Sequence, residues 1–368
     1  MPRVIGIDPG TVSIDLCGLD DGRLFLDRSL PTAEALADPR IIVELLEAAR
    51  PLDLVVGPSG YGLPLTAARD LTDTDITLAY LAREGEAGGI GGLRSLMRAL
   101  AASALPVILT PGVIHLGSVP AHRKVNRVDM GTADKVCAAA LAVREQAARR
   151  GCREREVSLI LLEMGGAFTA ALVVQHGQII DGIGGSSGPL GVRSAGGLDG
   201  EVAFLAGAIS KRVLFEGGAA SIAGDAEADP EDLANPTTPA GRVAWQAYVE
   251  GAVKAVAAMA VSISDPADRL HTACDVILSG RLSHIPAVSD EMARRLARLM
   301  PEASVHVLTG FASVAKQGAQ GAALLADGLA GGASAVLVEA LGIREARGTV
   351  LDHLYVISPA VARERLGM

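Results

Sequence analysis

One pattern occurs twice along the chain, and it constrains the fold more than any other feature of the sequence. An apolar run that ends in an acid, RVIGID (3–8), leads into a Pro-Gly-Thr turn and then into two β-rich runs joined at Asp20-Asp21-Gly22. The same pattern occurs again in VSLILLEMGG (157–166), which is followed by two β-rich runs joined at His176-Gly177. Because short turns of this kind between β-rich runs are strong hairpin signals, both segments predict antiparallel strands. Internal repetition on this scale predicts a duplicated α/β domain, with boundaries at 1–150 and 151–368.

The remaining segments complete each half as a mixed α/β unit. Apolar runs separated by helical patterns predict parallel strands with crossover helices at 52–57 and 106–110, and further strands that end in glycine turns are predicted at 275–280 and 304–310. Helices are predicted over 132–150, 239–263 and 313–329, and their expected terminal signals are Thr132, Gly151, Thr238 and Pro239. The acidic, proline-rich stretch 223–239 predicts an exposed loop, within a helical insertion over about 199–270.

The composition excludes several classes of function. The net charge is −9, which disfavours binding to a nucleic acid backbone. The longest apolar stretch, 251–263, is interrupted by Lys254 and is shorter than the roughly 20 residues of a membrane span. No export signal is recognisable at the N-terminus, and the four cysteines are too scattered for a metal or redox motif. These features predict a cytoplasmic protein with free thiols, in which Cys17 and Cys137 fill the core.

The first repeated turn is a candidate phosphate site. The strand before it delivers Asp8 to its carboxyl end, and Pro9, Gly10 and Thr11 form a turn whose amides and hydroxyl can approach phosphate oxygens. Asp8 would face a phosphate-bound Mg²⁺ through water, because Mg²⁺ prefers oxygen ligands and keeps much of its hydration. Taken alone, Asp-Pro-Gly is equally typical of an ordinary hairpin turn.

The second turn supplies matching chemistry. Gly165 and Gly166 follow the second apolar strand and offer backbone amides to a phosphate, and Thr169 offers a hydroxyl. Two further strands end in glycine turns that suit a nucleoside lying on bare backbone, and the residues concerned are Ser279, Gly280 and Gly310. Gly318 and Gly321, in the last long helix, are instead expected to permit close helix packing.

This order of a phosphate turn, a linking helix, a second phosphate turn, a strand-glycine segment and a Gly/Ala helix resembles the superfamily of acetate and sugar kinases, Hsp70 and actin. The stretch GIGGSSGPLGVRSAGGLD (182–199) resembles that of acetate and butyrate kinases, and the whole chain is similar to an uncharacterised family described as predicted butyrate kinases. The resemblance implies two duplicated ribonuclease-H-like domains with a central cleft that holds ATP and Mg²⁺. It implies ATP-dependent phosphoryl transfer to a small carboxylate, and a possible homodimer.

Residue roles follow from the same resemblance. Arg193 matches the arginine that steadies the transferring phosphoryl group, although a surface arginine beside glycine turns is an equal alternative. Those kinases carry a histidine where this chain has Glu163, a carboxylate suited to binding Mg²⁺ or activating water. Acceptor-side residues are expected in the loop after the strand 52–57, at Ser59 and Tyr61, and where the linking helix begins, at Arg123, Arg127, Asp129 and Asp134. For the neighbouring Lys124, a solvated loop position is the preferred interpretation.

Two other functions remain open on the sequence alone. The departure at Glu163 keeps a nucleotide-dependent switch or assembly factor, with or without ATPase activity, as the alternative to a carboxylate kinase. A carbamoyl transferase of the same superfamily would need paired metal-binding histidines. The seven histidines of this chain include no H-x-x-x-H pair, so that function ranks last.

Overall fold

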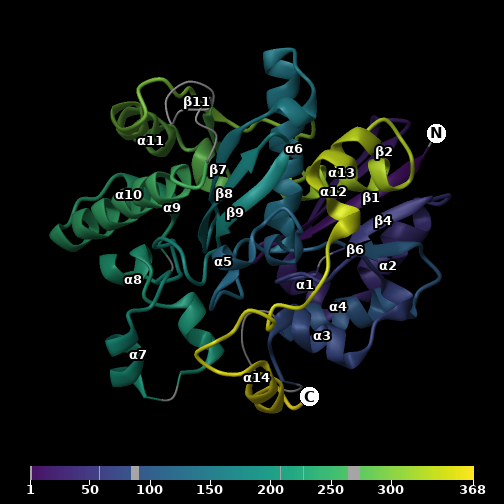
Figure 1. Ribbon diagram of the computed structural model, residues 1–368, viewed down its shortest axis with the longest axis horizontal. Helices are drawn as coiled ribbons and strands as arrows, with labels where there is room; N and C mark the ends of the chain where they lie inside the picture. The colour runs from purple at the N-terminus through teal and green to yellow at the C-terminus, as the bar shows by residue number, and fades with distance from the viewer. Residues whose placement is uncertain (1, 58, 84–90, 208, 227, 264–273) are drawn as a thin grey trace. The chain divides into compact units, whose positions relative to one another are not determined.

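The computed structural model describes residues 2–57, 59–83, 91–207, 209–226, 228–263 and 274–368 (Figure 1). Contacts divide the chain into two units. Unit 1 contains Met1–Val157, His176–Ile179 and Thr309–Met368, and unit 2 contains Ser158–Gln175 and Ile180–Leu308. The C-terminal segment is thus grouped with the N-terminal half, whereas the predicted boundary assigned it to the second half.

Unit 1 is built on one mixed sheet of six strands in the order β3-β2-β1-β4-β6-β5. Its strands are β1 (Arg3–Pro9), β2 (Ser13–Asp20), β3 (Arg23–Pro31), β4 (Leu54–Gly57), β5 (Thr66–Ala67) and β6 (Val107–Leu109). Its helices are α1 (Thr32–Ala37), α2 (Arg40–Ala48), α3 (Asp73–Tyr80), α4 (Gly91–Ala102), α5 (Ala121–Lys124), α6 (Ala133–Arg150), α12 (Gln317–Leu329), α13 (Ala335–Leu341) and α14 (Pro359–Arg365).

The alternation of side chains along β1 decides what each face of this sheet contacts. Ile5 and Ile7 join a core with α1, α2 and α4 on one face. Gly6, on the other face, lies so close to α12 that an added Cβ would be 2.2 Å from the backbone nitrogen of Ala323. Asp8 follows Gly6 with a period of two, so it also faces α12. This contact explains why the C-terminal segment joins unit 1, and Figure 1 shows α12 beside β1.

Unit 2 carries a second mixed sheet, with strand order β11-β10-β7-β8-β9. Its strands are β7 (Leu159–Met164), β8 (Thr169–Gln175), β9 (Gln178–Ile183), of which the first two residues are grouped with unit 1, β10 (Asp275–Ser279) and β11 (Val305–Val307). Its helices are α7 (Gly200–Ala206), α8 (Ala219–Ala223), α9 (Pro230–Ala234), α10 (Pro239–Ala260) and α11 (Pro286–Leu299). Helices α10 and α11 cover one face, where Leu162, Val249 and Met292 share a buried core.

The two sheets confirm the repeat. In each sheet, three consecutive antiparallel strands are followed by two strands that run parallel to the innermost of the three. The order β3-β2-β1-β4-β6 therefore corresponds to β9-β8-β7-β10-β11. Both predicted hairpin turns occur, and they use positive φ angles at Asp21 and Gly22 and at His176 and Gly177. Gly151 ends α6 in a left-handed conformation, and the Thr238 side chain caps α10, as predicted.

Two local predictions need correction. The stretch 223–239 is not a plain loop, because it contains α9, whose start is capped by the Asp229 side chain. Helix α12 begins at Gln317 and not near Ser313, because the preceding amides are bound by side chains described below. Cys17 and Cys137 are buried free thiols, as predicted. Among the residues that the structure describes, no helix is long and apolar enough to cross a membrane.

Candidate functional site

The turns after β1 and after β7 have the same backbone geometry. In the first, the amide of Gly10 donates to the carbonyl of Ser13 at 2.8 Å, and in the second the amide of Gly165 donates to the carbonyl of Phe168 at 2.9 Å. The two central residues of each turn donate their amides to no described residue. Each turn therefore presents two adjacent backbone N–H groups, which is the arrangement that binds anions in backbone nests.

Asp8 and Glu163 occupy equivalent positions before these turns. Asp8 pairs with Asp15 across the β1–β2 hairpin, and Glu163 pairs with Ala170 across the β7–β8 hairpin. In both hairpins, six residues lie between the acid and its cross-strand partner along the chain. Counted in this register, Thr11 is equivalent to Gly166, so the repeat places an acid and an amide nest together twice.

The Asp8 carboxylate is the most unusual group in unit 1. Its residue is 7% exposed, yet no described residue makes a hydrogen bond or ion pair with its side chain. Burial, and then the charge of Asp134, raise the pKa of Asp8 to about 7, against the opposing effects of Lys316 and Lys135. A buried carboxyl without a partner is costly in a purely structural position, and such groups concentrate at functional sites.

Asp134 supplies a second carboxylate at the start of α6. Burial alone would raise the pKa of Asp134, but the charge and hydrogen bond of Lys135 and the Thr132 hydroxyl hold it below its ordinary value. The Lys135 ammonium lies 2.7 Å from the Asp134 carboxylate. The Thr132 side chain binds Asp134 instead of capping the helix, which corrects its predicted role. Asp134 is therefore ionised beside a largely protonated Asp8 at acidic pH.

These two carboxylates fit the ligand chemistry of Mg²⁺. Both offer hard oxygen donors, and Asp8 has no protein partner to lose on binding a cation. Within the described part of the chain, no group of three or more His, Cys, Asp and Glu side chains is arranged to hold a metal. A cation bound here would keep several waters, as Mg²⁺ on nucleotides commonly does.

Lys316 also lies at the first turn, and sequence analysis did not single it out. Its ammonium is 2.9 Å from the carboxylate of Asp15 and 3.0 Å from the carbonyl of Ser13. It lies only 2.4 Å from where a Cβ on Gly10 would stand, so a side chain at that position would displace the ammonium. The signal available in the sequence was a lysine directly before the predicted Gly/Ala helix, but its partner is some 300 residues away.

The segment before Lys316 is held by three side chains, whose oxygens accept hydrogen bonds from seven consecutive backbone amides. The amides of residues 309–310 bind Glu145, those of 311–312 bind Gln320, and those of 313–315 bind Asp27. The Gln320 amide also donates to the carbonyl of Ala315 at 2.7 Å. Gly310, predicted to contact the nucleotide, has thus already committed its own amide to Glu145 at 2.9 Å. The whole segment is fixed without regular secondary structure.

Replacing Asp27 by alanine is expected to lower the free energy of unfolding by about 2 kcal/mol, because three amides lose a charged acceptor. Burial raises the pKa of Asp27, but these three amides outweigh it and hold the pKa below its ordinary value. The stabilisation is therefore present above about pH 4 and disappears as pH falls further. Urea unfolding at pH 7 and pH 3 measures it. Equal destabilisation at both pH values would contradict the prediction.

In unit 2, the predicted residues gather at the second turn. The backbone amides of Arg193 and Ser194 both donate to the carbonyl of Ala167, at 3.1 Å each, so the turn and the Arg193 segment are joined. Ser279 lies beside Glu163 in register on the neighbouring strand. A Cβ on Gly280 would stand 3.0 Å from the Glu163 carboxylate and 2.6 Å from the carbonyl of Met164. The Arg193 side chain is exposed.

Two predicted hydroxyls are buried. Thr169 lies within β8, paired with Met164, and its residue has no exposed surface. Its hydroxyl influences the titration of Tyr248 on α10, although neither group meets the geometry of a hydrogen bond to a described residue. Ser279 is also fully buried. Thr169 therefore differs from the expected counterpart of Thr11, because the spacing from the acid is six residues in one repeat and three in the other.

The predicted acceptor-side residues of unit 1 fall into a buried group and an exposed group. Tyr61 and Asp129 are buried together, since Asp129 contributes to raising the pKa of Tyr61 after burial itself. The amide of Ala133 donates to the carbonyl of Gly60 at 3.0 Å, which joins their segments next to Asp134. Ser59 is buried and donates to the carbonyl of Thr110.

The basic residues of the same region are arranged differently. Arg127 is exposed, and Arg123 is half-buried. Lys124 is buried and donates to the carbonyl of Leu116 at 2.9 Å, so its expected solvated position is wrong. Its pKa is lowered, first by burial and then by the charge of Arg347. Of the three cations, Arg123 and Arg127 keep side-chain surface that an anion can reach.

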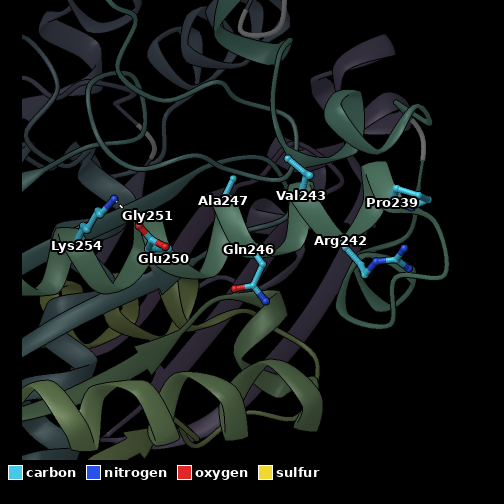
Figure 2. Close-up of a pocket in the computed structure, with 8 residues that line it drawn as sticks. All are labelled: Pro239, Arg242, Val243, Gln246, Ala247, Glu250, Gly251 and Lys254. Atoms are coloured by element: carbon cyan, nitrogen blue, oxygen red, sulfur yellow. Dashed lines mark ion pairs between the residues drawn. The ribbon is translucent and has the colours of Figure 1, made fainter.

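A groove of about 710 Å³ is lined by residues of α10 in unit 2 (Figure 2). All of its lining residues belong to that helix, and they are Pro239, Arg242, Val243, Gln246, Ala247, Glu250, Gly251 and Lys254. Glu250 and Lys254 pair with each other at 2.5 Å. None of the predicted site residues lines this groove, so the candidate site residues of each unit remain those at its own turn.

Comparison with known proteins gives a family and a fold. The sequence model of the family described as "Protein of unknown function (DUF1464)" matches residues 6–356. The chain belongs to this family. No curated protein matches the sequence. Within the solved structures, this DUF1464 protein resembles acetate and propionate kinases.

Three solved structures illustrate that similarity. A propionate kinase from Francisella tularensis has a TM-score of 0.59 at 12% identity, with 87% of this chain and 99% of that chain covered. The acetate kinase of Porphyromonas gingivalis gives 0.58 at 12%, covering 88% and 98%. The acetate kinase of Entamoeba histolytica gives 0.55 at 11%, covering 81% and 87%. At these identities the similarity shows the fold alone, which is that of acetate and propionate kinases, as the sequence predicted.

Proposed function

We propose that this DUF1464 protein is an ATP-dependent phosphotransferase that uses Mg²⁺ and acts on a small carboxylate. The observation that carries the proposal is the unpartnered, buried Asp8 beside Asp134, directly before a turn with two unbound amides. The same acid-and-turn arrangement recurs at Glu163. Its occurrence twice, in a fold shared with acetate and propionate kinases, supports a polyphosphate ligand.

In the proposed reaction, a carboxylate oxygen of the acceptor attacks the γ-phosphorus of ATP. The bond between that phosphorus and the β–γ bridging oxygen breaks, and the products are an acyl phosphate and ADP. Positioning and electrostatic stabilisation supply most of the acceleration in such transfers. The turns at Gly10 and Gly165 donate amides to phosphate oxygens, and Arg193 pairs with the transferring group.

The acid groups of unit 1 have a separate role. Asp8 and Asp134 hold Mg²⁺, which neutralises phosphate charge when it is bound. The acceptor carboxylate is drawn by Arg123 and Arg127, the basic residues of that region that reach the surface. Tyr61 and Asp129 lie buried next to the same segment and shape it. Glu163 orients the acceptor from the second turn.

The proposal is tested by incubating the purified protein with ATP, Mg²⁺ and a panel of short-chain acids. ADP release and trapping of the acyl phosphate with hydroxylamine are both measured. We expect at least one acid to stimulate ADP release and to yield the trapped product in equal amount. Binding of ATP without stimulation by any acid would instead favour the nucleotide-dependent switch, which the carboxylate at Glu163 keeps as the alternative.

Replacing Arg193 by alanine is expected to lower kcat by about 100-fold while nucleotide affinity changes little, because its charge acts on the transferring group. Turnover and equilibrium ATP binding measure the two effects separately. The matched control is Arg298→Ala, at an exposed arginine of α11 in the same unit. Unchanged turnover in Arg193→Ala, or an equal loss in Arg298→Ala, would remove Arg193 from the mechanism.

A further inference from the structure

One N–H donor of the Lys316 ammonium has no described acceptor at the first turn. An ammonium carries three N–H donors, and two of them are used by Asp15, at 2.9 Å, and by the carbonyl of Ser13, at 3.0 Å. No described residue accepts the third. The side chain is 39% exposed, although its Asp15 partner is only 1% exposed. The side chain of Lys316 is therefore partly open to solvent while its ammonium pairs with a buried carboxylate.

The ammonium is also next to the unbound amides of the turn. It is in contact with the α-carbon region of Gly10, and the following residues, Thr11 and Val12, are those whose amides have no described acceptor. The charge of Lys316 also acts on the buried and unpartnered carboxylate of Asp8 and opposes the rise of its pKa, so the two groups are close enough to interact. Backbone donors, a cation and a metal-binding carboxylate thus meet within one turn.

Many hydrogen bonds in unit 1 fix the position of Lys316. The seven amides before it are bound by Glu145, Gln320 and Asp27, and α12 begins directly after it. A lysine on a flexible segment would lose much side-chain and backbone entropy on binding an anion. The bound segment has lost the backbone part of that entropy already, so more of the interaction energy appears as affinity.

A purely structural role would be to neutralise Asp15. That role explains one of the two bonds of the ammonium, but it does not account for a third donor without a described partner beside a turn with unbound amides. The two roles predict different behaviour when Asp15 loses its charge. If neutralisation is the only role, then removing both charges together restores the wild-type properties.

We propose that Lys316 binds a non-bridging oxygen of the terminal phosphates of the nucleotide held by the Gly10 turn, and that Asp15 and Ser13 aim it there. The inference rests on the proposed function, because it assigns a residue to the polyphosphate part of that ligand. It makes Lys316 a residue that distinguishes a triphosphate from a nucleoside. An ammonium acting as a compact point charge suits phosphate oxygens, as lysines of phosphate-binding loops do.

The test measures dissociation constants by calorimetry for ATP, inorganic tripolyphosphate and adenosine. We expect Lys316→Gln to weaken ATP and tripolyphosphate by at least about 10-fold, as loss of a charged hydrogen bond does, and to leave adenosine unchanged. Lys316→Arg keeps the charge and is expected to retain part of the affinity. The double variant Asp15→Asn, Lys316→Gln also removes the buried charge of Asp15, so it leaves no unpaired carboxylate that could destabilise the fold. Its affinities for ATP and tripolyphosphate should remain as low as those of the single variant.

Each alternative outcome is decisive. ATP affinity in Lys316→Gln equal to that of the wild type overturns the inference and leaves the proposed function intact. Recovery of wild-type affinity in the double variant overturns it too, because the role is then only neutralisation of Asp15. If the wild-type protein binds neither ATP nor tripolyphosphate, then both the inference and the proposed function are overturned.

Discussion

Replacing Asp8 by asparagine is expected to stabilise the metal-free protein at pH 8 while lowering phosphoryl transfer by about 100-fold or more. The carboxyl is buried, and burial followed by the charge of Asp134 raises its pKa to about 7. In the unfolded chain its pKa is near the ordinary 3.8. The folded protein therefore resists ionisation of this group, and the unfolded chain does not.

The sign of the pH effect follows from this difference. Stability is highest where Asp8 is protonated in both states, below about pH 4, and it falls as pH rises from there to about 7. Above pH 7 the full cost, roughly 4 kcal/mol, is present. Asparagine has no charge to bury, so the gain in the variant appears at pH 8 and disappears near pH 4.

Thermal unfolding in the presence of a chelator, at pH 4 and pH 8, measures the effect. The control is Asp21→Asn, in the exposed β2–β3 turn, where φ is 51° and asparagine is well accommodated. Added Mg²⁺ should stabilise the wild type and not Asp8→Asn. A variant that is less stable than the wild type at pH 8 would show that the Asp8 carboxylate has a structural partner.

Replacing Gly321 by alanine is expected to cost about 3 kcal/mol or more of unfolding free energy, because the added methyl group has no space. Its Cβ would stand 1.8 Å from the carbonyl oxygen of Cys137 and 2.4 Å from the carbonyl carbon. Both atoms are backbone of α6, so no side-chain rotation relieves the clash, and α12 must move away from α6.

The thermal midpoint is expected to fall by about 10 °C. Gly117→Ala is the matched control, since nothing lies within 4 Å of an added Cβ there, and its effect should stay within about 0.5 kcal/mol. A midpoint for Gly321→Ala equal to that of the control would mean that α6 and α12 do not pack as closely as described. The same experiment tests whether glycine in this helix serves packing, as the sequence predicted.

Much of the architecture could be predicted because its signals are local. The alternation along 3–8 and 157–164, and the turns at Asp21-Gly22 and His176-Gly177, are short-range patterns that set strand pairing directly. The strand order follows from repeating such a unit. The predicted cleft between the two halves stays a prediction, as do the site roles.

The candidate site was harder to predict, because its geometry depends on contacts between distant segments. Lys316 reaches Ser13 across about 300 residues, and Glu145 reaches Gly310 across 165, and neither pair has a local signature. Thr169 illustrates another limit. A threonine near a glycine turn looks equivalent to Thr11 in sequence, but strand register turns it toward α10 and buries it. The prediction for Lys124 was wrong for a similar reason, since a charged residue at the end of a short helix can be buried when a carbonyl accepts a hydrogen bond from its ammonium.

The seven amides bound by Glu145, Gln320 and Asp27 have a consequence for dynamics. A segment without regular secondary structure ordinarily exchanges its amide hydrogens with solvent quickly. Here each backbone amide hydrogen of 309–315 is bonded to a side-chain oxygen, so exchange requires that hydrogen bond to break. Deuterium should therefore enter this irregular stretch as slowly as it enters a strand, and it should enter in three groups, one for each acceptor.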